Sequence, residues 1–174
     1  MPNLEGMAVT LGYVANNTFG PRPVAGIRLC LLRTLAREPR TLEDAMVGDG
    51  AAIHMAFDRD PYSASRARRT VQDCLDGTTP VETVSNAGLL TSELVTNVVI
   101  HTLTSGELVA YCDRLRKLVR IEVRDNSPVL PQMQDDSTDA SVGGVGLRLV
   151  DKVASSWGTT ATATGKTVWF ELSW

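Results

Sequence analysis

The sequence has few cysteines and no long apolar run, and each absence excludes a class of protein. Cys30, Cys74 and Cys112 are odd in number, far apart and without Cys-x-x-Cys spacing, so neither a disulfide framework nor a zinc site is expected. No apolar stretch approaches the roughly 20 residues that a membrane span needs. Residues 1–10 lack the basic start and apolar run of a secretory signal. We therefore expect a cytoplasmic protein with buried or idle thiols.

An excess of basic charge is also missing. The net charge of -3 and the pI near 5.4 argue against nucleic acid or an anionic membrane as the main partner. The length of 174 residues, with 43% hydrophobic and 21% charged residues, fits one globular domain with an appendage. We assign residues 1–50 to an N-terminal extension of uncertain order with no chemistry attached, and residues 51–174 to the folded domain.

Residues 89–102 have the spacing of an amphipathic helix. Leu90 and Leu94 begin an apolar stripe that continues one turn further on. Glu93 and Asn97 stand four residues apart on one edge of that stripe. A carboxylate and a carboxamide one turn apart can hold a hard cation or orient a nucleophile. The alternative is an ordinary solvated helix edge, and the stretch alone does not exclude it.

The middle of the chain alternates between strand and helix patterns. Residues 51–57 predict an opening strand, and Asp60 with Pro61 predicts a helix start that should run to Gly77. Residues 107–112 and 118–123 predict two antiparallel strands joined by a charged turn. Alternation in the second of these strands predicts a sheet with one face covered by helices and the other face wet.

The C-terminal third carries several turn signals. Asp125 ends a strand, where a turn-capping role is the alternative to a binding role. Gly144 and Gly146 open a helix that should end at Trp157-Gly158, and glycines with free N–H groups at a helix start suit an anion. Gly165-Lys166 predicts a solvent-exposed turn before a last strand over residues 167–172. The long polar loop before the glycines is typical of a lid or a disordered segment.

These pieces occur in an order that resembles the histidine kinase-like (GHKL) ATPase superfamily. The similarity is greatest to its single-domain branch, the anti-sigma-factor serine/threonine kinases of the actinobacterial type. The matching stretches are Ser92-Glu93-Leu94-Val95-Thr96-Asn97, Gly144-Val145-Gly146-Leu147-Arg148-Leu149-Val150-Asp151 and Gly165-Lys166-Thr167-Val168-Trp169-Phe170-Glu171-Leu172. The resemblance covers about residues 51–172. It implies an α/β (α+β) two-layer sandwich of the Bergerat type, with a mixed, mostly antiparallel sheet covered on one face by helices.

The resemblance also implies ATP and Mg²⁺ as cofactors and gives each site residue a role. Asn97 would hold the Mg²⁺ that bridges the phosphates, and Glu93 would orient or deprotonate the attacking hydroxyl. Asp125 would accept a hydrogen bond from the adenine amino group. The glycine-rich helix start and the last strand would contribute the remaining nucleotide contacts, and residues 131–142 would form the lid. Those remaining residues are Gly144, Gly146, Leu147 and Thr167.

The function implied is phosphorylation of a serine or threonine on an anti-sigma-factor antagonist, with sequestration of a sigma factor as a second activity. Relatives commonly form homodimers, and no direct contact with nucleic acid or membrane is expected. The glycines that usually follow the adenine-binding Asp are replaced in Asp125-Asn126-Ser127-Pro128-Val129, which stiffens the hinge. Two other readings therefore stay open: a nucleotide-gated protein-binding module without kinase activity, and an interaction domain that has lost nucleotide binding.

Overall fold

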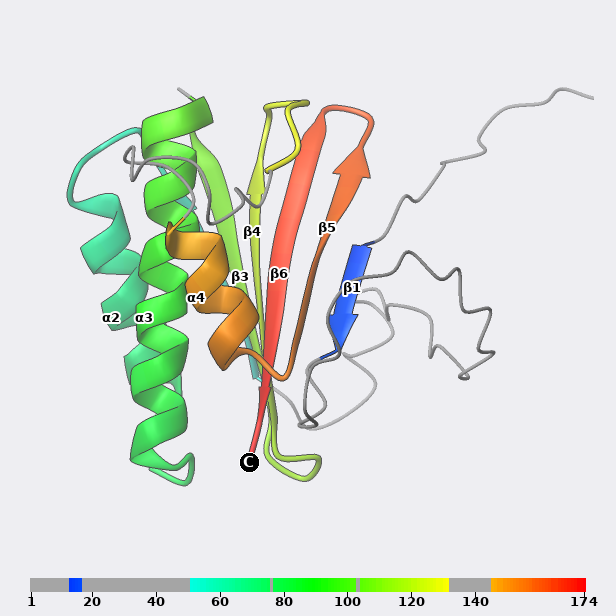
Figure 1. The fold of residues 1–174 in the computed structure, drawn as a ribbon. Coiled ribbons are helices and arrows are strands. Elements are labelled where there is room, and N and C mark those ends of the chain that lie inside the picture. The colour runs from blue at the N-terminus through cyan, green and yellow to red at the C-terminus, as the bar shows by residue number, and fades with distance from the viewer. Residues whose placement is uncertain (1–12, 17–50, 76, 103, 132–144) are drawn as a thin grey trace, which may run out of the picture.

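The computed structural model describes residues 13–16, 51–75, 77–102, 104–131 and 145–174. Along the chain, two strands are followed by two helices with a π-helical turn, two strands, a third helix and a final hairpin (Figure 1). They are β1 (Tyr13–Asn16), β2 (Ala51–Phe57), α2 (Ser63–Leu75), α3 (Val81–Asn97), a π-helical turn (Val98–Thr102), β3 (Gly106–Asp113), β4 (Leu118–Asp125), α4 (Val145–Val153), β5 (Ser156–Thr162) and β6 (Gly165–Ser173).

The strands form a six-stranded sheet in the order β1-β5-β6-β4-β3-β2. Helices α2, α3 and α4 lie together on one face of this sheet, as Figure 1 shows. The two-layer α+β sandwich expected from the sequence is therefore confirmed. Each described pairing between strands is antiparallel, so the described sheet contains none of the parallel pairs that a mixed sheet would have.

The core lies between the sheet and the helices. Because side chains alternate across a strand, every second residue of β3, β4 and β6 points toward the helix layer. Helix α3 packs against α2 and α4 as well as against β4 and β6, so its apolar stripe is at the centre. The fully buried side chains of this layer include Ala67, Val71, Leu90, Val95, Leu108, Val119, Ile121, Val150 and Phe170.

Several element boundaries differ from those expected. Asp60 accepts a hydrogen bond from the N–H of Tyr62 at 2.9 Å, and α2 starts at Ser63, two residues after Pro61. The stop at Gly77 is confirmed, since Gly77 follows α2 with a φ of 101° that suits glycine. The expectation that Trp157-Gly158 ends a helix is wrong: both residues lie in β5. The reason is that the preceding residue, Ser155, already bonds to β6 through the Glu171 carbonyl.

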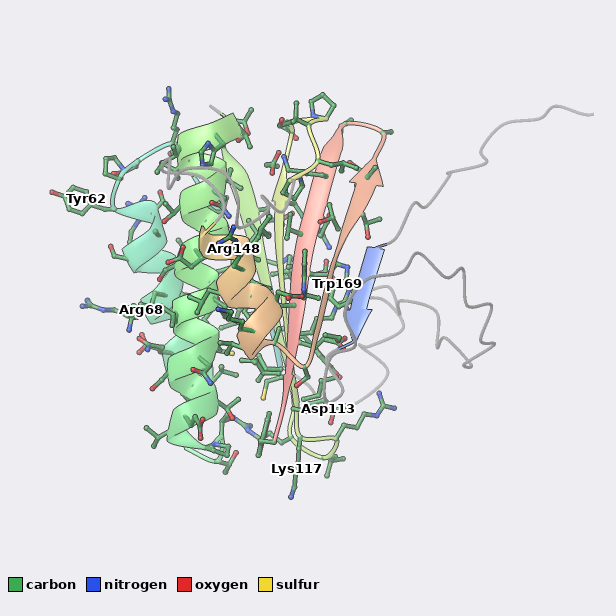
Figure 2. All side chains as sticks on the ribbon, in the orientation of Figure 1. Tyr62, Arg68, Asp113, Lys117, Arg148 and Trp169 are labelled. Carbon is green, nitrogen blue, oxygen red and sulfur yellow. The ribbon has the colours of Figure 1, made fainter. Side chains whose placement is uncertain are left out.

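The face of the sheet opposite the helices is not wet as predicted. Arg120 and Glu122 are each only 5% exposed. The Arg120 guanidinium donates to Glu122 and Glu171 at 2.9 Å each and lies 4.1 Å from the centre of the Trp169 ring. Figure 2 shows Trp169 on this side of β6. Buried charges on this face are thus paired with one another, which is the condition for burying them.

Part of the predicted extension joins the fold. Residues 13–16 form β1 and pair with β5 at the edge of the sheet, from Tyr13 opposite Thr159 to Asn16 opposite Ser156. The rest of residues 1–50 lies outside the described residues, so the boundary expected at residue 50 stays a prediction. The described part of the extension nevertheless supplies a strand, which its sequence did not predict.

We expect the Leu94→Ala substitution to lower the free energy of unfolding by about 2–5 kcal/mol, because Leu94 is 2% exposed and truncation leaves a cavity. Leu115→Ala is the matched control, since Leu115 is 87% exposed in the β3–β4 turn and should change stability by no more than about 0.5 kcal/mol. Urea unfolding followed by circular dichroism measures both. Equal effects of the two substitutions would show that α3 is not the centre of the core.

Candidate functional site

Glu93 and Asn97 lie one turn apart near the end of α3. Their neighbours Leu94 and Val95 are buried in the core, while Glu93 and Asn97 are half-buried on the flank of the helix. The helical period therefore puts the two polar side chains at the border of the apolar stripe, as the sequence predicted. Regular α-helical geometry up to Asn97 is therefore enough to position the Glu93 and Asn97 side chains.

The chain changes its helical geometry directly after Asn97. Residues Val98–Thr102 form a π-helical turn, which starts where the Val98 N–H is shared between the carbonyls of Leu94 and Val95. The Thr102 hydroxyl donates back to the Val98 carbonyl at 2.9 Å. Wider turns of this kind occur frequently at functional sites. Asn97 is thus the last residue of regular α-helix.

The start of α4 lies against these two side chains. A β-carbon added at Gly146 would lie 2.8 Å from Glu93 Oε2 and 3.4 Å from Asn97 Nδ2, so glycine permits a contact that a side chain would obstruct. Leu147, the next residue, is 4% exposed and belongs to the core. The structure thereby brings Glu93, Asn97, Gly146 and Leu147 together. Gly144 and residues 132–142 of the predicted lid lie outside the described residues.

The cluster of Glu93, Asn97, Gly146 and Leu147 has features that favour the binding of an anion together with a cation. The first turn of α4 has N–H groups without partners inside the helix, and the helix dipole adds positive potential there. Glu93 and Asn97 contribute a carboxylate and a carboxamide, whose oxygens suit a hard cation. Within the described ranges, no three His, Cys, Asp or Glu side chains are grouped to hold a metal ion. Glu93 and Asn97 are two side chains, so a metal held by them would take its other ligands from a bound molecule and water.

Asp125 lies at the end of β4 and forms a buried ion pair that the sequence analysis missed. The Lys166 ammonium is 2.8 Å from Asp125 Oδ1, and the two side chains are 6% and 0% exposed. The N–H of Ser127 donates to the same carboxylate oxygen at 2.8 Å. The second oxygen, Oδ2, is buried and accepts no hydrogen bond from any described residue. One acceptor of the carboxylate is thus left open.

The register of β6 explains this pair. Gly165 and Lys166 belong to β6, and Lys166 lies directly opposite Asp125. The predicted exposed turn at Gly165-Lys166 is therefore wrong; the turn is one step earlier, at residues 163–164. A β-carbon at Gly165 would collide with the Asp125 carbonyl and lie 2.7 Å from the Asn126 α-carbon. The close approach at Gly165 needs glycine and sets Lys166 against Asp125.

Thr167 lies on the opposite face of the sheet from Asp125. It is paired with Arg124 on β4 and Thr160 on β5, and side chains that are paired across strands share a face. Alternation along the strand could have indicated that Lys166, rather than Thr167, faces the helix layer with Asp125. The predicted contact between the Thr167 hydroxyl and a base stays a prediction.

A cavity of about 590 Å³ lies at this end of the sheet. Its lining comes from both faces of the sheet, since it includes Asp125 and Lys166 from one face and Glu107, Arg124 and Thr167 from the other. Glu93 and Asn97 do not line it. Figure 1 shows that the end of β4, the end of α3 and the start of α4 nevertheless point to the same end of the sandwich. The candidate site thus consists of two groups of residues at one end of the sandwich. The first group is Glu93, Asn97, Gly146 and Leu147, and the second is Asp125 and Lys166 with the other residues that line the cavity.

Burial raises the pKa of the Cys112 thiol and the Cys74 thiol above their ordinary values. The pKa of Tyr111 is raised by the same cause. All three groups are neutral near pH 7 and none lies in the two groups above. Both cysteines are free thiols, Cys112 buried and Cys74 half-buried, and Cys30 lies outside the described residues.

Comparison with known proteins decides the family. The model of the histidine kinase-like ATPase domain matches residues 57–172, which include both groups of the candidate site. The chain belongs to this family. No curated protein matches the sequence. None of the helices in the described residues is long and apolar enough to cross a membrane.

A solved structure supports the fold of this histidine kinase-like ATPase domain. It is the crystal structure of the RsbU and RsbW domains of Rv1364c from Mycobacterium tuberculosis, with a TM-score of 0.54 and 17% identity. The match covers 70% of this chain and 32% of that chain, so the present chain corresponds to about a third of that structure. At this identity the likeness concerns the fold alone.

Family membership implies nucleotide binding, and the described residues fit a nucleotide. Asp125 Oδ2 is a buried acceptor with no donor among the described residues, as a base amino group would require. Gly146 lets the start of α4 approach the flank of α3 closely, and N–H groups at a helix start suit phosphates.

We expect Asp125→Asn and Lys166→Met each to lower the free energy of unfolding by about 3–5 kcal/mol, because either change leaves one buried charge without its partner. The double substitution should cost clearly less than the sum of the two, and urea unfolding of all four proteins measures this.

The control is the exposed pair of Asp60 and Arg66, which is 3.2 Å apart. Removing either of its charges should cost about 1 kcal/mol or less. Additive effects of the Asp125 and Lys166 substitutions would mean that the buried pair is not coupled.

Proposed function

We propose that the chain is an ATP- and Mg²⁺-dependent protein serine/threonine kinase that acts on an anti-sigma-factor antagonist. The observation that carries this proposal is the close approach of Gly146, at the start of α4, to Glu93 and Asn97, which leaves no room for a β-carbon beside Glu93. It puts a candidate base and a candidate metal ligand beside N–H groups that suit phosphates. When bound, Mg-ATP supplies the transferred phosphoryl group and the metal that neutralises its charge.

Asn97 is the proposed metal ligand. Its carboxamide oxygen is neutral and hard, and Mg²⁺ in phosphate sites uses few protein ligands. The absence of a cluster of three or more acidic, His or Cys side chains among the described residues supports a site of this kind rather than a metal cage built by protein alone. Asn97 lies in the last regular turn of α3, at the end of the sandwich to which the start of α4 points.

Glu93 is the proposed catalytic residue. One turn before Asn97, its carboxylate lies close to Gly146 and can orient or accept the proton of a substrate hydroxyl. The positive end of the α4 dipole is close enough to stabilise a carboxylate there. Gly144, Gly146 and Leu147 complete the proposed phosphate-binding start of the helix, and Asp125 is the proposed acceptor for the base.

The partner follows from the class of domain. A serine or threonine hydroxyl on an antagonist protein is the proposed acceptor, and a sigma factor is the proposed second partner. The solved structure with an RsbW domain shares the fold, and the class of partner is part of the proposal. A cytoplasmic location and a homodimer belong to the same proposal.

A nucleotide-gated binding module without kinase activity is the second candidate. The turn after Asp125 favours it, because Ser127 is held by Asp125 at 2.8 Å and its hydroxyl accepts the Val129 N–H at 3.3 Å. With Pro128 inside this turn instead of glycine, the segment has less freedom to move during turnover. Such a module would bind Mg-ATP and leave its partner unmodified.

Labelled ATP separates the two candidates. With Mg²⁺ and a purified antagonist, the wild type should label the antagonist, Glu93→Gln should label it about 10²–10⁴-fold more slowly, and Asn97→Ala should not label it. Nucleotide affinity, measured by calorimetry, should change little for Glu93→Gln, because that group acts on the hydroxyl and not on the nucleotide.

Glu82→Gln is the matched control, since Glu82 is exposed in the first turn of the same helix. It should label the antagonist at the wild-type rate. Nucleotide binding without any labelling by the wild type would favour the binding module, and undiminished labelling by Asn97→Ala would exclude Asn97 as the metal ligand.

A further inference from the structure

The ion pair of Lys166 and Asp125 has a geometry that is suited to more than stability. Both side chains are almost fully buried, and the Lys166 ammonium contacts only one oxygen of the carboxylate, Oδ1, at 2.8 Å. The Ser127 N–H contacts the same oxygen. Two donors thus hold Oδ1 and fix the orientation of the carboxylate, while Oδ2 is left without a donor in the described structure.

A buried acceptor without a donor is unfavourable, because it has lost its water without gaining a partner. A ligand that brings one N–H group to Oδ2 would remove that cost. Lys166 can serve the same ligand. An ammonium group has three N–H donors, of which Asp125 Oδ1 takes one and the Ser127 carbonyl, at 3.4 Å, takes at most a second.

The charge of the pair decides what kind of ligand group it fits. A buried lysine without a counter-charge would attract a phosphate, but Lys166 is neutralised by Asp125 at hydrogen-bond distance. The pair is therefore neutral overall and offers one acceptor next to one donor. Its complement is an uncharged planar edge with a donor beside an acceptor, such as the amino group and adjacent ring nitrogen of a 6-aminopurine.

We propose that Lys166 and Asp125 together recognise the base of the bound nucleotide by hydrogen bonds to its edge. Asp125 Oδ2 accepts from the exocyclic amino group, and the Lys166 ammonium donates to the adjacent ring nitrogen N1. Gly165 makes this arrangement possible by letting β6 approach Asp125 closely enough to bring Lys166 into register. The inference rests on the proposed function only in requiring that a nucleotide binds at Asp125.

The test is calorimetric titration with Mg-ATP and with 1-deaza-ATP, in which N1 is replaced by C–H and the amino group is kept. The wild type should bind 1-deaza-ATP at least about tenfold more weakly, since a charge-assisted hydrogen bond is lost. Lys166→Met should bind the two nucleotides with nearly equal affinity. Lys166→Arg keeps a donor and a charge and should still prefer Mg-ATP. Circular dichroism confirms that each variant is folded.

Lys152→Met is the matched control, because Lys152 is an exposed lysine of α4, and it should keep the wild-type preference. Equal affinity of the wild type for the two nucleotides would overturn the role of Lys166 while leaving nucleotide binding intact. A preference that survives in Lys166→Met would also overturn it, since another group would then read N1. If Lys166→Met does not fold, the wild type and Lys166→Arg decide. Absence of binding to the folded wild type would overturn the proposed function as well.

Discussion

Burial of the apolar stripe of α3 is the constraint on which the site depends. The helix lies among α2, α4 and the sheet, and residues such as Leu90 and Val95 are completely buried. Once that stripe faces the core, the helical period leaves Glu93 and Asn97 no position except the flank. The hydrophobic effect thereby positions two polar side chains, and Gly146 lets α4 close against them.

The two faces of the sheet bury different kinds of side chain. Toward the helices the strands present apolar side chains, whereas the other face presents Arg120 and Glu122 in a buried network with Glu171 and Trp169. Buried charges are tolerated because each has a partner, and removing one partner leaves the other uncompensated. A slip of one residue in β4 would move these charges into the apolar core, so the network helps to fix the register of the sheet.

Much of the architecture could be predicted from the sequence, because periodicity identifies both strands and helices. The helix around Glu93 and Asn97, the hairpin of β3 and β4, and the two-layer arrangement followed from local patterns and from resemblance to a family. What failed depends on pairing between distant segments. The burial of Arg120 depends on the Glu171 carboxylate of β6, while Glu122 is paired with Arg120 and Arg124 of its own strand. Trp157 is a strand residue because β6 pairs with it. Such tertiary pairing overrides a local turn or helix signal.

Lys166 illustrates the same limit at the site. A glycine followed by a lysine is typical of an exposed turn, and only the pairing with Asp125 shows that both residues are in a strand. Since successive side chains lie on opposite sides of a sheet, Lys166 and Thr167 are one position apart in sequence but separated by the whole thickness of the sheet. If Thr167 were aligned with a residue whose hydroxyl faces the helices in another protein, Thr167 would be given a role that belongs to the opposite face of the sheet. When β6 is compared with the same strand of another protein, two positions are equivalent only if their side chains face the same side of the sheet. Gly165 and Thr167 share one side and Lys166 lies on the other, whatever the residue type.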